Sequence, residues 1–177
     1  SFKEAIELSY LGASVIHPKT IKPLENKNIS LSIRSFIDLS NPGSLIGSVG
    51  RNDKDMPSII YKPNQILLTI STIDYSFIFE EHMSKLFSIF FKMGLKVHLM
   101  QNSALSCSVC GIILPNNFDH LISDLQKKYI VKYNTKVNLL TIRYFKNLEV
   151  PKLFQNQEVL IQQRSRSTLR YVLKEKK

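Results

Sequence analysis

The order of hydrophobic periodicities between Ile66 and Tyr133 constrains the fold more than any other feature of this 177-residue sequence. Alternating apolar residues predict four strands, Ile66–Ile73, Lys96–Gln101, Ser106–Leu114 and Ile130–Tyr133. Apolar residues at helical spacing predict one helix from Phe79 to a C-cap at Gly94, and a second over Phe118–Tyr129. The predicted order is therefore β-α-β-β-α-β, the split-βαβ arrangement of ferredoxin-like domains.

Segments on both sides of this unit begin a second one. Ser58–Tyr61 is a predicted short strand, separated from the next strand by a break at Pro63-Asn64. Val137–Tyr144 alternates like the first strand of a new unit, and Glu158–Lys174 is a predicted hairpin. Between them Pro151 stands where a long helix would be needed. We therefore expect a degenerate internal repeat whose second copy is shortened.

The first 50 residues follow a different pattern. Ser1 and Glu4 have the spacing of a capping box, and the apolar residues that follow predict a helix that is closed by His17-Pro18. Ile29–Phe36 alternates like a half-buried strand, and the polar segment 50–57 is a candidate linker or surface loop.

The composition excludes several classes of protein. With 44% hydrophobic residues the chain can bury a core, yet it has no apolar run of the about 18–20 residues that would span a bilayer. The first residues lack the basic-then-apolar order of a signal peptide. Two cysteines do not make a disulfide scaffold and are compatible with a reducing compartment. We expect a globular, cytoplasmic chain with no membrane partner.

The residue types that carry chemistry form no recognisable catalytic or metal-binding motif. Cys107 and Cys110 have no second cysteine pair to complete a zinc site, and residues three apart on a strand point to opposite faces. The histidines are scattered without metal-ligand spacing; they are His17, His82, His98 and His120. Phosphate-binding, dinucleotide-binding and nucleophile-elbow motifs are also missing. The sequence predicts no catalytic residue and no metal site.

The charge leaves a nucleic-acid hypothesis open. The chain has 24 Lys and Arg against 14 Asp and Glu, a net charge of +10, and much of the excess lies in Arg143–Lys177. Charged residues on an exposed hairpin face are common, and no recognition helix or RNA-binding aromatic motif accompanies them. We expect no specific nucleic-acid partner, and a basic nucleic-acid-binding module is the weakest of three hypotheses.

A longer motif lies at Glu4–Ile46, which reads EAIELSYLGASVIHPKTIKPLENKNISLSIRSF and then NPGSLIG. It resembles the end of the catalytic domain in the aspartate kinase family, where the segment runs approximately E-A-x-E-L-A-x-x-G-A-K-V-L-H-P-R-T-I-x-P. The residues in register are Gly12, Ala13, His17, Pro18, Thr20, Pro23, Ile29 and Gly43. Family members continue into two ACT domains, which are ferredoxin-like modules, in agreement with the repeat described above.

The resemblance implies an α+β fold of tandem ferredoxin-like ACT domains, the second truncated, preceded by a helix-strand remnant of the amino acid kinase domain. Residues 1–50 would end the kinase domain and residues 64–135 would form the first ACT domain. Residues 57–63 and 136–177 would form the second, shortened ACT domain, because the family inserts the first module within the second.

The resemblance also implies an activity for a longer parent protein. Aspartate kinases phosphorylate L-aspartate with ATP and Mg, at the start of lysine, threonine and methionine biosynthesis. The opening K-F-G-G-T-S motif of the family has no counterpart here, so catalytic residues and cofactors would belong to a missing N-terminal kinase domain. A family lysine near the nucleotide is replaced by Ser14. We expect this segment itself to hold no cofactor.

An amino-acid effector would bind at the first ACT domain. N–H groups before the helix suit an α-carboxylate, and the neighbouring strand offers oxygen atoms. In lysine-inhibited relatives an aspartate on this strand pairs with the effector's ammonium, whereas this chain has His98, a poor ammonium partner, and Asp74 is placed to compensate. The predicted effector-binding residues are Asp74, Tyr75, Ser76, Phe77, Ile78, His98, Met100, Gln101, Asn102 and Ser103.

Two functional hypotheses follow from the resemblance. In the first, the chain is a regulatory module that senses lysine or threonine and forms a homodimer through its ACT domains. In the second, effector binding has been lost and the chain is a purely structural dimerisation module. The shortened second unit and His98 favour this alternative.

Overall fold

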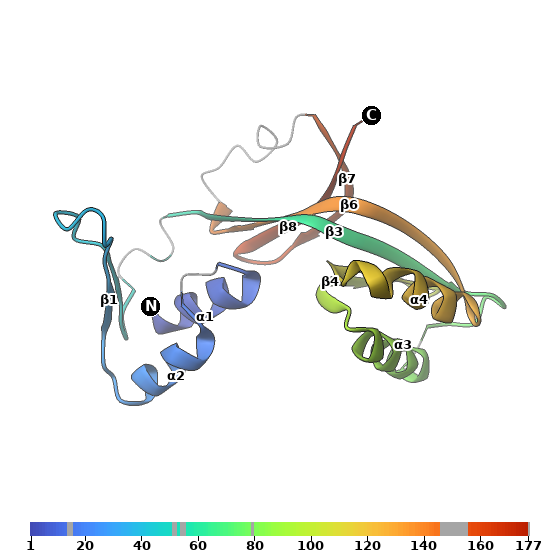
Figure 1. Cartoon of the computed structure of the whole chain (residues 1–177), viewed down its shortest axis with the longest axis horizontal. Helices are drawn as coiled ribbons and strands as arrows, with labels where there is room; N and C mark the ends of the chain where they lie inside the picture. The colour runs from blue at the N-terminus through green and yellow to red at the C-terminus, as the bar shows by residue number, and fades with distance from the viewer. Residues whose placement is uncertain (14–15, 51–52, 54–55, 79, 146–155, 177) are drawn as a thin grey trace. The chain divides into compact units, whose positions relative to one another are not determined.

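The computed structural model describes residues 1–13, 16–50, 53, 56–78, 80–145 and 156–176. The chain forms two compact units (Figure 1). Unit 1 contains the described residues of Ser1–Ile60, Thr141–Leu148 and Arg166–Thr168. Unit 2 contains those of Tyr61–Leu140, Glu149–Ser165 and Leu169–Lys177. The domain boundaries expected from the family resemblance stay a prediction.

Unit 1 opens with the predicted capped helix. Helix α1 (Phe2–Leu11) begins at Ser1, whose Oγ accepts a hydrogen bond from the N–H of Glu4 at 3.2 Å. It ends at Gly12, which has φ 114° and donates its N–H to the carbonyl of Leu8. A positive φ of this kind favours glycine, so the helix has both its start and its stop signal in the local sequence.

The next elements of unit 1 were only partly predicted. Helix α2 (Pro18–Asn26) was not predicted; it begins at His17, whose Nδ1 accepts from the N–H of Lys19 at 3.2 Å, with Pro18 in its first turn. Strand β1 (Leu31–Ile33) is shorter than the predicted Ile29–Phe36. It pairs antiparallel with β2 (Ser44–Ile46) over three residue pairs. The predicted strand bounds, Ile29 and Phe36, were both wrong, because alternation of residues does not reveal how far a partner strand reaches.

The remaining strands form one sheet with the order β4-β5-β3-β6-β8-β7. Its elements are β3 (Ser58–Thr72), α3 (Glu80–Met93), β4 (Lys96–Asn102), β5 (Ser106–Ile112), α4 (Pro115–Gln126), β6 (Tyr129–Arg143), β7 (Gln157–Arg164) and β8 (Thr168–Glu175). The described pairings of β3 with β5, β4 with β5 and β7 with β8 are all antiparallel. The α+β class, the β-α-β-β-α-β order and the C-terminal hairpin are confirmed.

Two predicted strand breaks were wrong. Strand β3 continues through Pro63-Asn64, and β6 joins the predicted strands Ile130–Tyr133 and Val137–Tyr144 into one. The ladder between β3 and β5 starts only at Ile66, so the missing N–H of Pro63 removes no hydrogen bond to β5. Strand β3 thus stays extended through its turn-forming residues in a part that does not pair with β5. The predicted absence of a helix around Pro151 lies outside the described residues.

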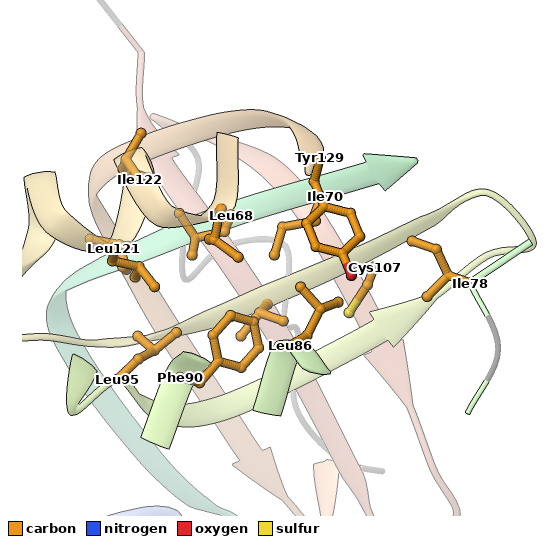
Figure 2. Close-up of a cluster of buried hydrophobic side chains, with 13 residues drawn as sticks. Leu68, Ile70, Ile78, Leu86, Phe90, Leu95, Cys107, Leu121, Ile122 and Tyr129 are labelled. Atoms are coloured by element: carbon orange, nitrogen blue, oxygen red, sulfur yellow. The ribbon is translucent and has the colours of Figure 1, made fainter. Parts of the chain in front are cut away.

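The apolar core of unit 2 lies between the sheet and helices α3 and α4. Figure 2 shows its thirteen buried side chains, which include Phe90 and Leu86 of α3, Leu121 of α4, and Leu68 of β3. On the opposite face of the sheet a second cluster contains Leu67 and Leu99. Cys107 lies in the first cluster and Cys110 in the second, which confirms that the two thiols point to opposite faces. They are free, and burial raises the pKa of Cys107 to about 11 and of Cys110 to about 12.

Candidate functional site

The loop between β3 and α3 has a defined internal structure. Asp74 Oδ1 accepts hydrogen bonds from the N–H of Ser76 at 3.1 Å and from its hydroxyl at 2.7 Å. These donors hold the pKa of the Asp74 carboxyl below its ordinary value, so it is ionised at neutral pH. Tyr75 has φ 59° and is 80% exposed, which turns its side chain out to solvent. The loop therefore presents a carboxylate and an aromatic ring beside the start of α3.

The structure brings this loop together with the turn between β4 and β5. The N–H of Ile78 donates to the carbonyl of Ala104 at 2.9 Å. In the turn, the N–H of Ser103 donates to the carbonyl of Ser106 at 2.8 Å, and their hydroxyl oxygens are 2.8 Å apart. Asn102 reaches α3, where its Nδ2 lies 3.7 Å from Met83 Sδ. Residues 74–78 and 102–103 of the predicted effector set thus lie at one end of unit 2.

The other predicted effector residues are placed differently. Met100 packs against the apolar core with its side chain, and its carbonyl accepts from Gln163 Nε2 at 2.6 Å. Gln101 is exposed on β4. His98 lies four residues before Asn102, about 13 Å along the strand, and its Nδ1 is 2.7 Å from Gln65 Oε1. The structure does not bring His98 together with the loop, and the assignment of the whole set to an effector stays a prediction.

His98 is neutral at physiological pH. Its pKa is lowered to about 4, first by burial and then by the positive charges of Lys62, Lys96 and Arg170. Its main-chain oxygen also accepts a hydrogen bond from Arg170 Nη2 at 2.6 Å. Sequence reasoning singled out His98 but not these neighbours, because they come from three strands that only the sheet brings together.

The loop end of unit 2 suits a small ligand that carries an ammonium group. Glu80 and Glu81 open α3, and Glu81 is paired with Lys85 at 2.6 Å. Together with Asp74 they make this end acidic, although the first N–H groups of a helix attract anions. Among the described residues there is no group of three or more His, Cys, Asp or Glu side chains that could hold a metal ion.

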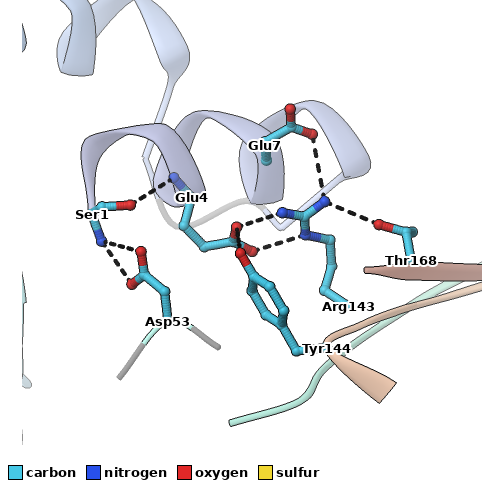
Figure 3. Close-up of polar contacts among 7 residues, drawn as sticks. All are labelled: Ser1, Glu4, Glu7, Asp53, Arg143, Tyr144 and Thr168. Carbon is cyan, nitrogen blue, oxygen red and sulfur yellow. Dashed lines mark hydrogen bonds and ion pairs between the residues drawn. The ribbon is translucent and has the colours of Figure 1, made fainter. Parts of the chain in front are cut away.

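Unit 1 contains a second polar arrangement, which we call the Glu4–Arg143 network (Figure 3). Arg143 Nε donates to Glu4 Oε1 at 2.9 Å, and Nη2 donates to Oε2 at 2.5 Å. Both side chains are only 10% exposed. The network is completed by the Tyr144 hydroxyl, which donates to Glu4 at 3.0 Å, by Thr168, which accepts from Nη1 at 3.0 Å, and by Glu7, at 3.8 Å from Nη1.

The electrostatics of the network follow from its burial. The hydrogen bond with Glu4 raises the pKa of Arg143, and burial raises the pKa of the Tyr144 phenol. The guanidinium also lies 5.2 Å from the centre of the Tyr144 ring. Sequence reasoning assigned Glu4 to the helix cap alone. The capping box gave no indication that the same side chain would accept two hydrogen bonds from a residue 139 positions later.

Unit 1 also has a cavity of about 1020 Å³. Its lining comes from α1 and from the segments around β1 and β2, and includes Ala5, Leu8, Ile33 and Ile46. Other apolar side chains of unit 1 are exposed, with Phe36 at 95% and Ile37 at 97%. The described part of the chain therefore leaves apolar surface of unit 1 in solvent.

No family model matches the chain. It is 28% identical over 144 residues to aspartokinase 3, chloroplastic, of Arabidopsis thaliana, a match that covers 74% of this chain and 25% of the relative. It is 42% identical over 72 residues to a bifunctional aspartokinase/homoserine dehydrogenase of Haemophilus influenzae, which covers 40% of this chain and 9% of the relative. The chain thus spans about a quarter or less of the length of these relatives.

Solved structures agree with these matches. An aspartate kinase of Clostridium acetobutylicum superposes with a TM-score of 0.79 at 20% identity, over 97% of this chain and 44% of that one. A C-terminal regulatory domain of an aspartate kinase from Porphyromonas gingivalis, described as putative, covers 67% of this chain with a TM-score of 0.55. E. coli aspartokinase III, in complex with lysine and aspartate, covers 97% with a TM-score of 0.74 at 19% identity.

The aspartate kinase match confirms the resemblance inferred from Glu4–Ile46 and the ACT-type fold. No helix among the described residues is long and apolar enough to cross a membrane. The Arabidopsis aspartokinases are named as chloroplastic, and the compartment of this chain stays a prediction.

Proposed function

We propose that this chain is the regulatory, C-terminal part of an aspartate kinase and that it senses an end-product amino acid. The observation that carries the proposal is the meeting of the loop 74–78 with the turn at Ala104 beside the start of α3. This places main-chain N–H groups, a carboxylate and exposed aromatic rings at one end of an ACT-type unit. An α-amino acid has the complementary groups.

The parent enzyme would transfer a phosphoryl group from ATP to the carboxyl group of L-aspartate. Its ATP and Mg would be held by an N-terminal kinase domain, for which unit 1 supplies the last elements. The cavity of unit 1 and the exposed Phe36 and Ile37 support this, because apolar surface of that kind is normally covered by further protein.

The acidic surroundings of the loop favour lysine over threonine as the effector. Lysine carries a side-chain ammonium in addition to its α-ammonium, and Asp74 and Glu80 are acidic residues at this end of unit 2. The E. coli enzyme in complex with lysine supports the same choice by analogy. His98 would take no part in contacting the effector, since it lies at the other end of β4.

A homodimer through the ACT units is the second part of the proposal. Helix α3 has Phe90 in the core but leaves Phe91 90% exposed and Phe87 43% exposed. Two large aromatic side chains on one helix are suited to an interface with a second copy. An effector that prefers one arrangement of the two copies would shift the attached kinase domains toward it.

Calorimetric titration of the 177-residue chain with lysine, threonine and methionine tests the effector. We expect saturable binding of lysine, weakened about tenfold in Asp74→Asn because one charge-assisted hydrogen bond is lost. Asp119→Asn on α4 removes the same charge from an exposed position and should leave the affinity unchanged. The absence of binding by all three amino acids, with a dimer still present by sedimentation, would instead favour the purely structural dimerisation module.

A further inference from the structure

Strand β4 is bound along its main chain by side chains of the C-terminal hairpin, β7–β8. Among the described strands, β4 is the first of the sheet order and has β5 as its neighbour, whereas the hairpin lies at the other end of that order. Gln163 Nε2 nevertheless donates to the carbonyl of Met100 at 2.6 Å, and Arg170 Nη2 donates to the carbonyl of His98 at 2.6 Å. All four residues belong to unit 2. The hairpin therefore holds β4 although it is not its neighbour in the sheet.

The register of the hairpin places the two donors together. Gln163 of β7 is the cross-strand partner of Arg170 of β8, and directly opposite side chains extend from the same face of a sheet. On β4, the ladder with β5 shifts register between Val97 and Leu99, so His98 lies where β4 has one residue more than β5. The carbonyl of this extra residue accepts the hydrogen bond from β8, and the carbonyl two residues later accepts the one from β7.

Apolar packing supports the same contact between the hairpin and β4. The second cluster of buried side chains includes Leu99 of β4 and Val172 of β8. Two side chains of β7, Leu160 and Ile161, pack against this cluster. The two hydrogen bonds thus lie beside a packed apolar layer, where water competes less for a carbonyl oxygen than it does at an open surface. A carbonyl in such a place that loses its donor is costly to leave without a partner.

Strand β4 runs directly into the turn of the proposed amino-acid site. Met100 is two residues before Asn102, the last residue of β4, and Ser103 follows in the turn. The turn meets the loop before α3 through the hydrogen bond from the N–H of Ile78 to the carbonyl of Ala104. A ligand bound between this loop and this turn fits best when their separation matches its length. What fixes β4 therefore also fixes the separation that the ligand must match.

We propose that Gln163 is a positioning residue of the amino-acid site, because it holds β4 and thereby the turn 102–104 relative to the start of α3. This inference rests on the proposed function. Gln163 acts through the main chain of Met100 and not by contact with the effector. A site whose parts are held in place before binding loses less conformational entropy when the ligand binds. The C-terminal hairpin thereby contributes to the affinity for the effector and to the choice of its length.

Calorimetric titration of the full 177-residue chain with lysine and with ornithine, whose side chain is shorter by a methylene group, tests this inference. Gln163→Met keeps the length of the side chain and removes its donor. We expect it to weaken lysine binding about fivefold and to lower the preference for lysine over ornithine about threefold, because a less fixed turn discriminates less between ligand lengths. Gln162→Met makes the same change at the adjacent, exposed position of β7 and should leave both quantities unchanged.

Two readouts separate positioning from a general loss of stability. By NMR, the carbonyl carbon shift of Met100 should change in Gln163→Met and stay the same in Gln162→Met, because it reports the hydrogen bond itself. A smaller folded population lowers the apparent affinities for lysine and ornithine by the same factor, so only a change in their ratio indicates positioning. An unchanged ratio or an unchanged Met100 shift in Gln163→Met overturns this inference alone. If the unaltered chain binds none of lysine, threonine and methionine, the proposed function is overturned, and this inference with it.

Discussion

The apolar core of unit 2 and the Glu4–Arg143 network of unit 1 hold their surroundings together in different ways. The core spreads its stabilisation over thirteen buried side chains, which come from three strands, both helices and two connecting loops. The network joins α1 to the end of β6 through one carboxylate that serves both Arg143 and Tyr144. Apolar contacts are non-directional, and each buried side chain adds part of the stability. A buried ion pair is different, because removing one partner leaves the other charge buried and unpaired.

The two regions therefore differ in how well they tolerate substitutions and in how strongly they specify which segments meet. A core of many side chains accepts a similar apolar side chain in place of another at small cost. The buried pair of Glu4 and Arg143 requires both charges and a fixed bidentate geometry. It therefore specifies which segments meet in unit 1, while the core of unit 2 supplies most of the stability of that unit.

The largest expected effect is in the apolar core. Phe90→Ala removes a ring that is 1% exposed and should lower the free energy of unfolding by about 3–5 kcal/mol, because a cavity remains. Lys92→Ala is the control on the same helix; its side chain is exposed, so the loss should stay within about 0.5 kcal/mol. Urea unfolding measures both. Equal losses would contradict the placement of Phe90 in the core.

The Glu4–Arg143 network should show the next largest effect. Glu4→Gln leaves the Arg143 guanidinium buried without its counter-charge. The substitution should lower the free energy of unfolding by about 3 kcal/mol, and by less where water hydrates the guanidinium. Glu7→Gln is the control, because Glu7 is 45% exposed and 3.8 Å from Arg143. Hydrogen exchange of the α1 amides reads out the loss locally. The double variant Glu4→Leu with Arg143→Met should recover part of it, and a double variant worse than Glu4→Gln would contradict this explanation.

A smaller effect is expected from pH at His98. The unfolded chain binds a proton near the ordinary pKa of 6.5, whereas folded His98 does so only near a pKa of about 4. The free energy of unfolding should therefore fall as the pH drops from 6.5 to 4, by about 1 kcal/mol after allowance for solvent screening, and then level off. His98→Gln should flatten this part of the stability profile, with His120→Gln as the control. An unchanged slope in His98→Gln would assign the pH dependence to other groups.

Local sequence signals determined the elements of this protein and much of their order. The capping box at Ser1 and Glu4, the glycines at positions 12 and 94, and the alternation from Ile66 onward act within a few residues, so they can be read without a structure. The opposite orientation of Cys107 and Cys110 follows from the same period-two rule. The family resemblance of the N-terminal motif was likewise present in the residues themselves.

Tertiary structure alone decided where strands continue and which charges meet. Pro63-Asn64 signals a break, yet β3 continues through it because the lost donor is not needed by β5. Glu4 meets Arg143 across 139 positions, and His98 meets Gln65 and Arg170 from other strands. Such contacts depend on the pairing of distant segments, and a pairing is selected by the free energy of the whole sheet. A local sequence pattern does not reveal which distant segments pair, because the residues that meet in space are far apart along the chain.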